Sequence, residues 1–185
     1  MTKLTAFFDL IKNQFEYGGK KYAHDKEKES TDCLFDDFGK GWLFGTMAKY
    51  CKRIKNLKRE RDILKISTYI YILWLKRGFH ISTLGSSTPV NTTVDIKSKY
   101  FNTFRVLTNE FLNQNPSIIY NVDNNTVIDN LYGVFTDWNN KDWGNLKEKD
   151  LMEAFGLCYG IWVSEFSESA GQDQDCYNET KGKPE

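Results

Sequence analysis

A dense run of basic side chains is the strongest chemical signal in this sequence. Between positions 49 and 65 the only acidic residues are Glu60 and Asp62. Lysine and arginine donate charge-assisted hydrogen bonds to phosphate oxygens, so a cluster of them can bind a nucleotide or a nucleic acid. The cations are Lys49, Lys52, Arg53, Lys55, Lys58, Arg59, Arg61 and Lys65. We predict that they form a phosphate-binding edge; the alternative is a helix face that is merely solvated.

Metal binding by carboxylates is a second candidate chemistry. Asp32 and Asp36 are four residues apart, so on a helix both carboxylates could face one Mg²⁺ ion, which Asp62 could join from the next helix. Glu60 lies two residues before Asp62, about 200° around a helix, so these two cannot easily share a metal. A Mg²⁺ ion held by Asp32, Asp36 and Asp62 could activate water against a phosphoanhydride.

Part of the chain resembles a known enzyme family. Residues 17–80 contain a glycine-lysine-lysine-tyrosine-alanine opening at 19–23, and an Asp followed by two hydrophobic residues and a later Tyr at 62–69. In these features the stretch resembles small phage-encoded proteins distantly related to the MazG-like all-α nucleotide pyrophosphohydrolases. The resemblance implies an α-helical, usually oligomeric enzyme that uses Mg²⁺ to hydrolyse nucleoside triphosphates to monophosphates. Here Arg59 stands three residues before Asp62, where the family has a carboxylate.

Other catalytic signals are weak. The two histidines, His24 and His80, are far apart, and neither is accompanied by a Ser or Cys in a recognisable elbow. The glycines at 39–45 are not followed by the Lys-Ser/Thr pair that completes a phosphate loop. The four cysteines lack C-x-x-C spacing, which argues against a zinc finger and favours free thiols in a reducing compartment. We therefore expect a binding protein without a cofactor rather than an enzyme.

Composition limits the class of protein. A chain of 185 residues with 40% hydrophobic and 27% charged residues is typical of one soluble domain with a sizeable core. The formal net charge is zero, so attraction to phosphate must come from a local patch. No apolar run approaches the ~18 residues of a membrane span, and no signal peptide is evident. We expect a cytoplasmic protein, in the host-cell cytoplasm if the source is viral.

Hydrophobic periodicity predicts an all-α, single-domain bundle of about six helices over residues 1–166, followed by a flexible acidic tail over 167–185. The third helix is apolar nearly all round, which is typical of a central helix. We identify no internal repeat. The predicted helices span about 2–15, 42–56, 58–77, 92–113, 126–138 and 146–166, with a helical turn at 33–38 and a short strand at 117–122. Gly18 and Gly19 are expected to end the first helix, and Gly39 and Gly41 to interrupt the chain before the second.

Three functional hypotheses remain. The leading one is a helical accessory protein of phage or mobile-element origin that binds a nucleotide, a nucleic acid or a protein partner through the basic edge. The second is a divergent Mg²⁺-dependent pyrophosphohydrolase. The third is a structural subunit, also as a homo-oligomer, whose aromatic surface is buried in a larger assembly. Trp138 and Trp143 are the candidates for that surface, whereas core packing is favoured for Tyr159 and Trp162. None of the three involves a membrane.

Overall fold

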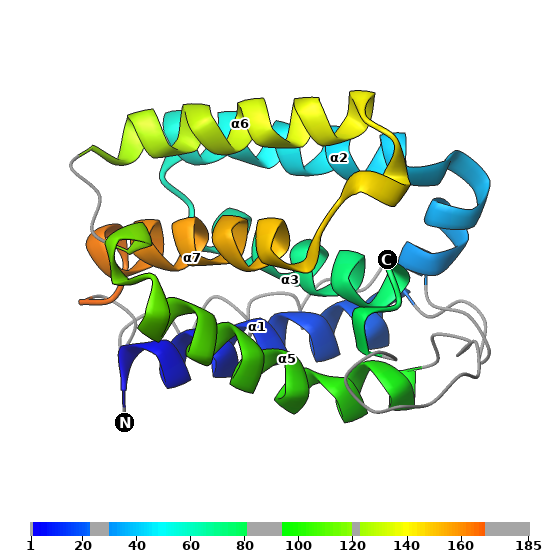
Figure 1. Ribbon diagram of the computed structural model, residues 1–185, viewed down its shortest axis with the longest axis horizontal. Helices are drawn as coiled ribbons and strands as arrows, with labels where there is room; N and C mark the ends of the chain where they lie inside the picture. Colours follow the sequence, from blue (N-terminus) through cyan, green and yellow to red (C-terminus); the bar gives the residue numbers. More distant parts are fainter. Residues whose placement is uncertain (1, 23–29, 81–93, 120–122, 169–185) are drawn as a thin grey trace, which may run out of the picture.

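Six α-helices stacked in three layers of two form the described part of the computed structural model (Figure 1). The structure describes residues 2–22, 30–80, 94–119 and 123–168. The helices are α1 (Lys3–Tyr22), α2 (Ser30–Leu57), α3 (Glu60–Lys76), α5 (Val94–Gln114), α6 (Asn124–Asn140) and α7 (Glu148–Glu165), with 3₁₀ turns η1 (Pro116–Ile118) and η2 (Trp143–Asn145). The predicted all-α bundle of about six helices is confirmed.

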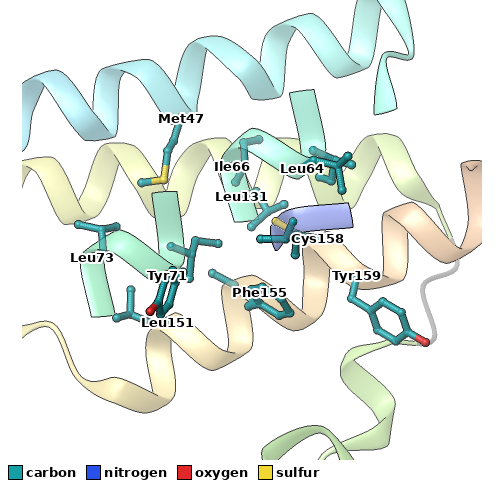
Figure 2. Packing of buried hydrophobic residues seen from close by; sticks show 14 of the residues in the cluster. Met47, Leu64, Ile66, Tyr71, Leu73, Leu131, Leu151, Phe155, Cys158 and Tyr159 are labelled. Carbon is teal, nitrogen blue, oxygen red and sulfur yellow. The ribbon is translucent and has the colours of Figure 1, made fainter. Parts of the chain in front are cut away.

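The central layer consists of α3 and α7, which are covered on both sides. Helices α2 and α6 lie side by side in one outer layer, and α1 and α5 form the other (Figure 1). Twelve of the 17 residues of α3 are buried, which confirms that its nearly all-round apolar pattern marks a central helix. In Figure 2, Met47 from α2 and Leu131 from α6 lie among side chains of the central layer such as Leu73 and Phe155.

Two hydrogen bonds join the ends of the central helices. Trp74 Nε1, near the end of α3, donates to Glu148 Oε1 at 2.6 Å, and Trp162 Nε1, near the end of α7, donates to Glu60 Oε1 at 2.7 Å. Glu60 and Glu148 are the first residues of α3 and α7, where the helix dipole favours a negative charge. Both indoles are buried, so each needs such an acceptor. Trp162 is therefore a core residue, not part of an exposed aromatic surface.

Several element boundaries differ from the sequence prediction. α1 continues through Gly18 and Gly19 to Tyr22, because glycine lowers helix stability by only about 1 kcal/mol and does not forbid helical angles. The predicted strand at 117–122 is wrong over 117–118, which belong to a 3₁₀ turn that begins at Pro116, a residue suited to a first helical turn. Residues 120–122, most of the predicted loop at 79–91, and the tail from 169 onward lie outside the described residues.

The predicted interruption before the second long helix is confirmed at Gly39 alone. α2 runs on either side of a kink at this residue, which has φ 66° and ψ −165°. The part before the kink turns away from α6 toward the end of α3 (Figure 1), where Lys76 Nζ lies 5.1 Å from the ring centre of Phe35. The kink thus lets one helical element belong to an outer layer and also cover one end of the bundle.

We predict that Gly39→Ala lowers the free energy of unfolding by about 1–3 kcal/mol, because a residue with a Cβ is strained at these backbone angles. Gly45 is the matched control, since it lies in the regular part of α2 and has open space where a Cβ would be added. Gly45→Ala should leave stability unchanged or raise it by up to about 1 kcal/mol. Urea unfolding of both variants measures the difference, and equal effects would contradict this role of Gly39.

His80 gives the fold a dependence on pH. Its ring is 2% exposed, and neither nitrogen has a hydrogen-bond partner among the described residues. The ring centre lies 4.6 Å from that of Tyr100 and 6.0 Å from that of Trp74. Burial lowers the pKa of His80 below its ordinary value of 6.5.

The unfolded chain therefore takes up a proton on His80 more readily than the folded protein. We expect the contribution of His80 to stability to be complete above pH 6.5 and to be lost as the pH falls through the lowered pKa of the folded protein. His80→Phe should remove this part of the pH dependence. Urea unfolding of both proteins at pH 7.5 and 5.5 measures how far the free energy of unfolding falls with pH. An equal fall in wild type and in His80→Phe would argue against the prediction.

Candidate phosphate-binding surface

Three cations from two helices surround the ring of Tyr50. Lys49 Nζ lies 5.2 Å from the ring centre, Arg53 Cζ 5.4 Å and Lys65 Nζ 5.2 Å. Lys65 Nζ also lies 3.4 Å from Tyr50 Oη. These distances are in the range of cation–π contacts. Lys49, Tyr50, Arg53 and Lys65 are called the Tyr50 cluster below, and they concentrate positive charge at the edge between α2 and α3.

A short junction between the helices makes this convergence possible. α2 ends at Leu57 and α3 begins at Glu60, so only two residues reverse the direction of the chain. Lys58 adopts φ 45°, in the left-handed region that commonly ends a helix. The reversal places Lys65, one turn after the start of α3, against the last turns of α2.

Asp62 lies beneath the cluster and supplies a carboxylate to it from inside. The side chain is fully buried, and Arg53 Nε lies 3.2 Å from Asp62 Oδ2. Neither oxygen of Asp62 makes a hydrogen bond of good geometry with a described residue, so the contact is an ion pair only. Because this carboxylate is enclosed, it offsets the charge of Arg53 without occupying the outer face of the cluster.

Tyr50 itself is buried, and two half-buried aromatic side chains continue from it along the two helices. The rings of Tyr50 and Tyr69 are stacked, with centres 6.2 Å apart, and Trp42 meets Tyr69 edge-on at 6.1 Å. Trp42 and Tyr69 are half-buried. Sequence analysis identified the cations but missed these rings. The spacing held a signal, because Trp42, Lys49 and Arg53 recur at helical intervals and share one face of α2, with the buried Tyr50 beside it.

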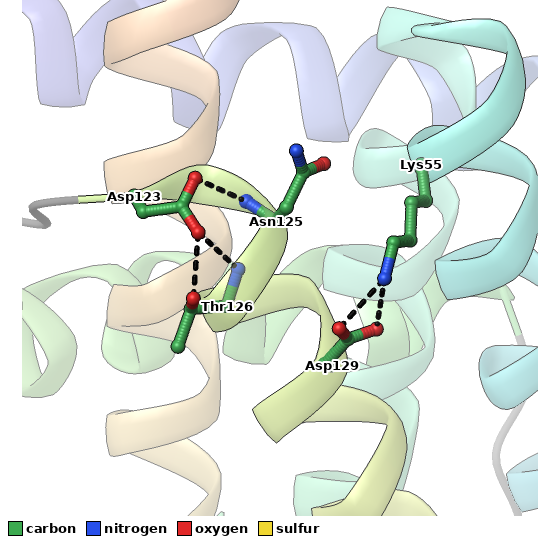
Figure 3. A network of polar contacts seen from close by, with 5 residues as sticks. All are labelled: Lys55, Asp123, Asn125, Thr126 and Asp129. Atoms are coloured by element: carbon green, nitrogen blue, oxygen red, sulfur yellow. Dashed lines mark hydrogen bonds and ion pairs between the residues drawn. The ribbon is translucent and has the colours of Figure 1, made fainter.

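The remaining predicted cations do not join the cluster. Lys55 Nζ binds both carboxylate oxygens of Asp129 on α6, at 2.7 and 2.9 Å (Figure 3). Lys58 Nζ lies 3.5 Å from a carboxylate oxygen of Glu165 on α7, while Arg59 and Arg61 are exposed. A helix turns about 100° per residue, so neighbouring cations in a dense run must point in different directions. The predicted single edge is thus divided among several surfaces.

The α6 end of this polar network is fixed by its N-cap. Asp123 accepts hydrogen bonds from the backbone N–H groups of Asn125 and Thr126 and from the Thr126 hydroxyl (Figure 3). These bonds, that to the Thr126 hydroxyl first among them, hold the pKa of Asp123 below its ordinary value. The cap sets the start of α6, so that Asp129 faces Lys55.

A shallow groove between α2 and α6 adjoins the cluster. It has a volume of about 380 Å³ and is lined by Phe44, Gly45, Ala48, Lys49, Lys52, Tyr132, Phe135, Thr136 and Asn139. Lys52 Nζ lies 4.9 Å from the ring centre of Tyr132. The lining contains two lysines and no carboxylate, so the groove continues the positive surface, with Lys49 contributing to both.

The proposed magnesium ligands are not brought together by the described side chains. Asp62 is enclosed and paired with Arg53, and Asp36 is exposed on the part of α2 before the kink. The side chain of Asp32 lies outside the description. Among the described residues, no group of three or more histidine, cysteine, aspartate or glutamate side chains could hold a metal ion. The magnesium site stays a prediction.

Two of the four cysteines are structural. Cys51 and Cys158 are buried free thiols. Burial raises the pKa of Cys51 to about 12 and also raises that of Cys158. Neither thiol is therefore activated as a nucleophile.

Compared with known proteins, the chain matches no family model, no curated protein and no solved structure. The MazG-like resemblance therefore stays a prediction. In the described ranges, no helix is long and apolar enough to cross a membrane.

We predict that Arg53→Ala lowers the free energy of unfolding by roughly 2–3 kcal/mol, because it leaves Asp62 buried without its ion-pair partner. The value is below that of a fully buried pair, since the Arg53 side chain is 31% exposed. Asp62→Asn in the same chain should recover part of the loss, because the amide carries no charge. Chemical unfolding of the single and double variants measures this coupling, and strictly additive effects would contradict it.

Proposed function

We propose that this protein binds a phosphate-bearing ligand, a nucleotide or a nucleic acid, at the Tyr50 cluster, as a binding protein rather than an enzyme. The observation that carries the proposal is the convergence of Lys49, Arg53 and Lys65 within 5.4 Å of one ring, above a carboxylate that is wholly buried. The cluster gathers three cations on a chain whose formal net charge is zero.

Phosphate suits this arrangement for an electrostatic reason. Lys49 and Lys65 come from different helices and meet at one ring, so an anion between them could accept from both ammonium groups. Arg53 is held in place by Asp62, so it loses little side-chain freedom when it binds. Lys52 on the adjoining groove offers a further contact for a second phosphate.

The aromatic surface favours a ligand that also carries a base. Tyr69 and Trp42 continue from Tyr50 along the same edge and are only half-buried. Base stacking on an aromatic side chain is worth about 1–3 kcal/mol per base and tolerates any base. A nucleotide or a single strand would therefore gain more from this surface than inorganic phosphate.

We expect ATP and an oligothymidylate of twelve nucleotides to bind in low salt and in the presence of EDTA, with affinity that falls as salt is added. Lys49→Ala and Lys65→Ala should each weaken binding roughly 5- to 10-fold, the loss of one charge-assisted contact. Lys12→Ala is the matched control, since Lys12 is an exposed lysine on α1. Isothermal titration calorimetry measures all four proteins; Arg53 is avoided because its replacement also affects stability.

The two probes distinguish the sources of phosphate. Binding of ATP alone indicates a nucleotide, and a strong preference for the oligonucleotide indicates a nucleic acid. Binding that requires Mg²⁺ and is followed by release of pyrophosphate would replace the proposal with the hydrolase hypothesis. Absence of binding to either probe in low salt, or equal effects of the Lys49 and Lys12 variants, would refute it and turn attention to a protein partner.

A further inference from the structure

The two central helices share a sequence pattern, so the earlier finding of no internal repeat is wrong. α3 begins Glu-Arg-Asp-Ile-Leu at residue 60, and α7 begins Glu-Lys-Asp-Leu-Met at residue 148. A tyrosine and then a tryptophan follow at the same distances in each, as Tyr71 and Trp74 in α3 and as Tyr159 and Trp162 in α7. The reciprocal bonds between the first glutamate of each helix and the tryptophan of the other are therefore two instances of one contact.

Ring geometry repeats in the same way. Tyr71 and Trp74 are stacked with centres 6.2 Å apart at 22°, and Tyr159 and Trp162 are stacked at 6.3 Å and 20°. This agreement involves both residues of each pair, so it reflects the same local packing on α3 and α7.

The outer helices pack on these pairs in equivalent ways, α5 on the pair of α3 and α1 on the pair of α7. Phe104 of α5 lies 5.1 Å from Tyr71 and 5.5 Å from Trp74, measured between ring centres. Phe7 of α1 lies 5.5 Å and 5.2 Å from the equivalent rings of α7. Helix α1 thus relates to α7 as α5 relates to α3.

The other outer layer carries the same relation. α2 contains Leu-Phe-Gly-Thr-Met from Leu43, and α6 contains Leu-Tyr-Gly-Val-Phe from Leu131. Leu131 follows Leu43 by the same number of residues that separates Glu148 from Glu60, so the two helix pairs align without a shift at these positions. In every layer the two helices run in opposite directions (Figure 1), as an approximate two-fold axis requires.

We infer that α1–α3 and α5–α7 are two versions of one three-helix unit, and that the second unit carries a counterpart of the phosphate site that its own carboxylates close. The second part of this inference rests on the proposed function. The alignment pairs Lys49 with Asp137, Tyr50 with Trp138, Arg53 with Lys141, Asp62 with Asp150 and Lys65 with Glu153.

Three of the five counterpart residues line a small pocket. Trp138, Lys141 and Asp150 line it, together with Phe44, Asp142, Asn145 and Leu146, around a volume of about 70 Å³. Lys141 forms an ion pair with Asp137, the residue that replaces Lys49. An aromatic ring, one cation and one aspartate are thus retained, while both lysines are replaced by acids. Asp150 is partly exposed and accepts a hydrogen bond from the backbone N–H of Lys147, whereas Asp62 is buried and pairs with Arg53.

This comparison bears on why the cations of the Tyr50 cluster are present. A helix face in this fold stays solvated equally well with Asp137 and Glu153 as with Lys49 and Lys65, because both acidic residues are exposed. The second unit therefore does not require lysine at these positions, whereas in the first unit Lys65 is half-buried and lies 3.4 Å from Tyr50 Oη. Like-charge repulsion excludes phosphate from the second site, and the fold leaves one site of two open to it.

The test is a reversal of charge at the counterpart, with ATP in EDTA at low salt as the probe. Wild type should bind one ATP per chain, and Asp137→Lys/Glu153→Lys should bind two. Glu16→Lys/Glu110→Lys is the matched control, because it changes the net charge equally on exposed positions of α1 and α5 and should stay at one. Calorimetry gives the stoichiometry, and circular dichroism checks that each variant is folded.

A second set of variants exchanges the charges of the Tyr50 cluster and of its counterpart. Lys49→Asp/Lys65→Glu should fold with a similar Tm and lose ATP binding, and adding Asp137→Lys/Glu153→Lys should restore binding of one ATP. Folded variants that stay at one ATP after reversal at the counterpart, or are not restored in the second set, would overturn the closed-site inference while leaving the proposed function intact.

Failure of wild type to bind ATP or the oligonucleotide would instead refute the proposed function, and the closed site with it. The two-unit part is then judged separately by Trp74→Phe and Trp162→Phe, each of which removes one of the paired indole bonds. Matching losses of Tm support it, and clearly unequal losses overturn it.

Discussion

Burial of two helices on both sides is the condition on which the rest of this structure depends. Most residues of α3 and α7 are buried, so the polar groups near their ends that lie inside the bundle must be satisfied there. The bonds from Trp74 to Glu148 and from Trp162 to Glu60 meet this need and fix the register of the antiparallel pair. The outer layers then pack on a central layer whose position is already set.

The candidate site is a consequence of the same packing. α3 is held in the centre, and the two-residue junction with α2 brings Lys65 to the ring of Tyr50. Asp62 turns inward because α3 is covered at that position, and it draws Arg53 across the helix boundary. Arg53 is therefore oriented from beneath by a buried charge, while Lys49 and Lys65 lie close to the ring of Tyr50.

The approximate two-fold relation accounts for the core positions that the two units share, and it leaves their surface charges free to differ. Positions that pack in the centre, such as those of Tyr71 and Tyr159, are shared because both units bury them in the same way. Positions on the rim are exposed, so Lys49 and Asp137 can differ in sign between the two units. A binding site on such a rim can change in one unit alone.

The sequence by itself determined the helical class, the central place of α3 and most helix positions, because hydrophobic periodicity is a local property that survives in any packing. It also marked the basic stretch, but not which of its cations meet, since that depends on the direction of α3 after the turn at Lys58. Only the tertiary structure showed that Lys55 and Lys58 are paired with acids of α6 and α7 and that Asp62 is enclosed. These features rest on contacts between residues far apart in the chain, about which spacing along one helix carries no information.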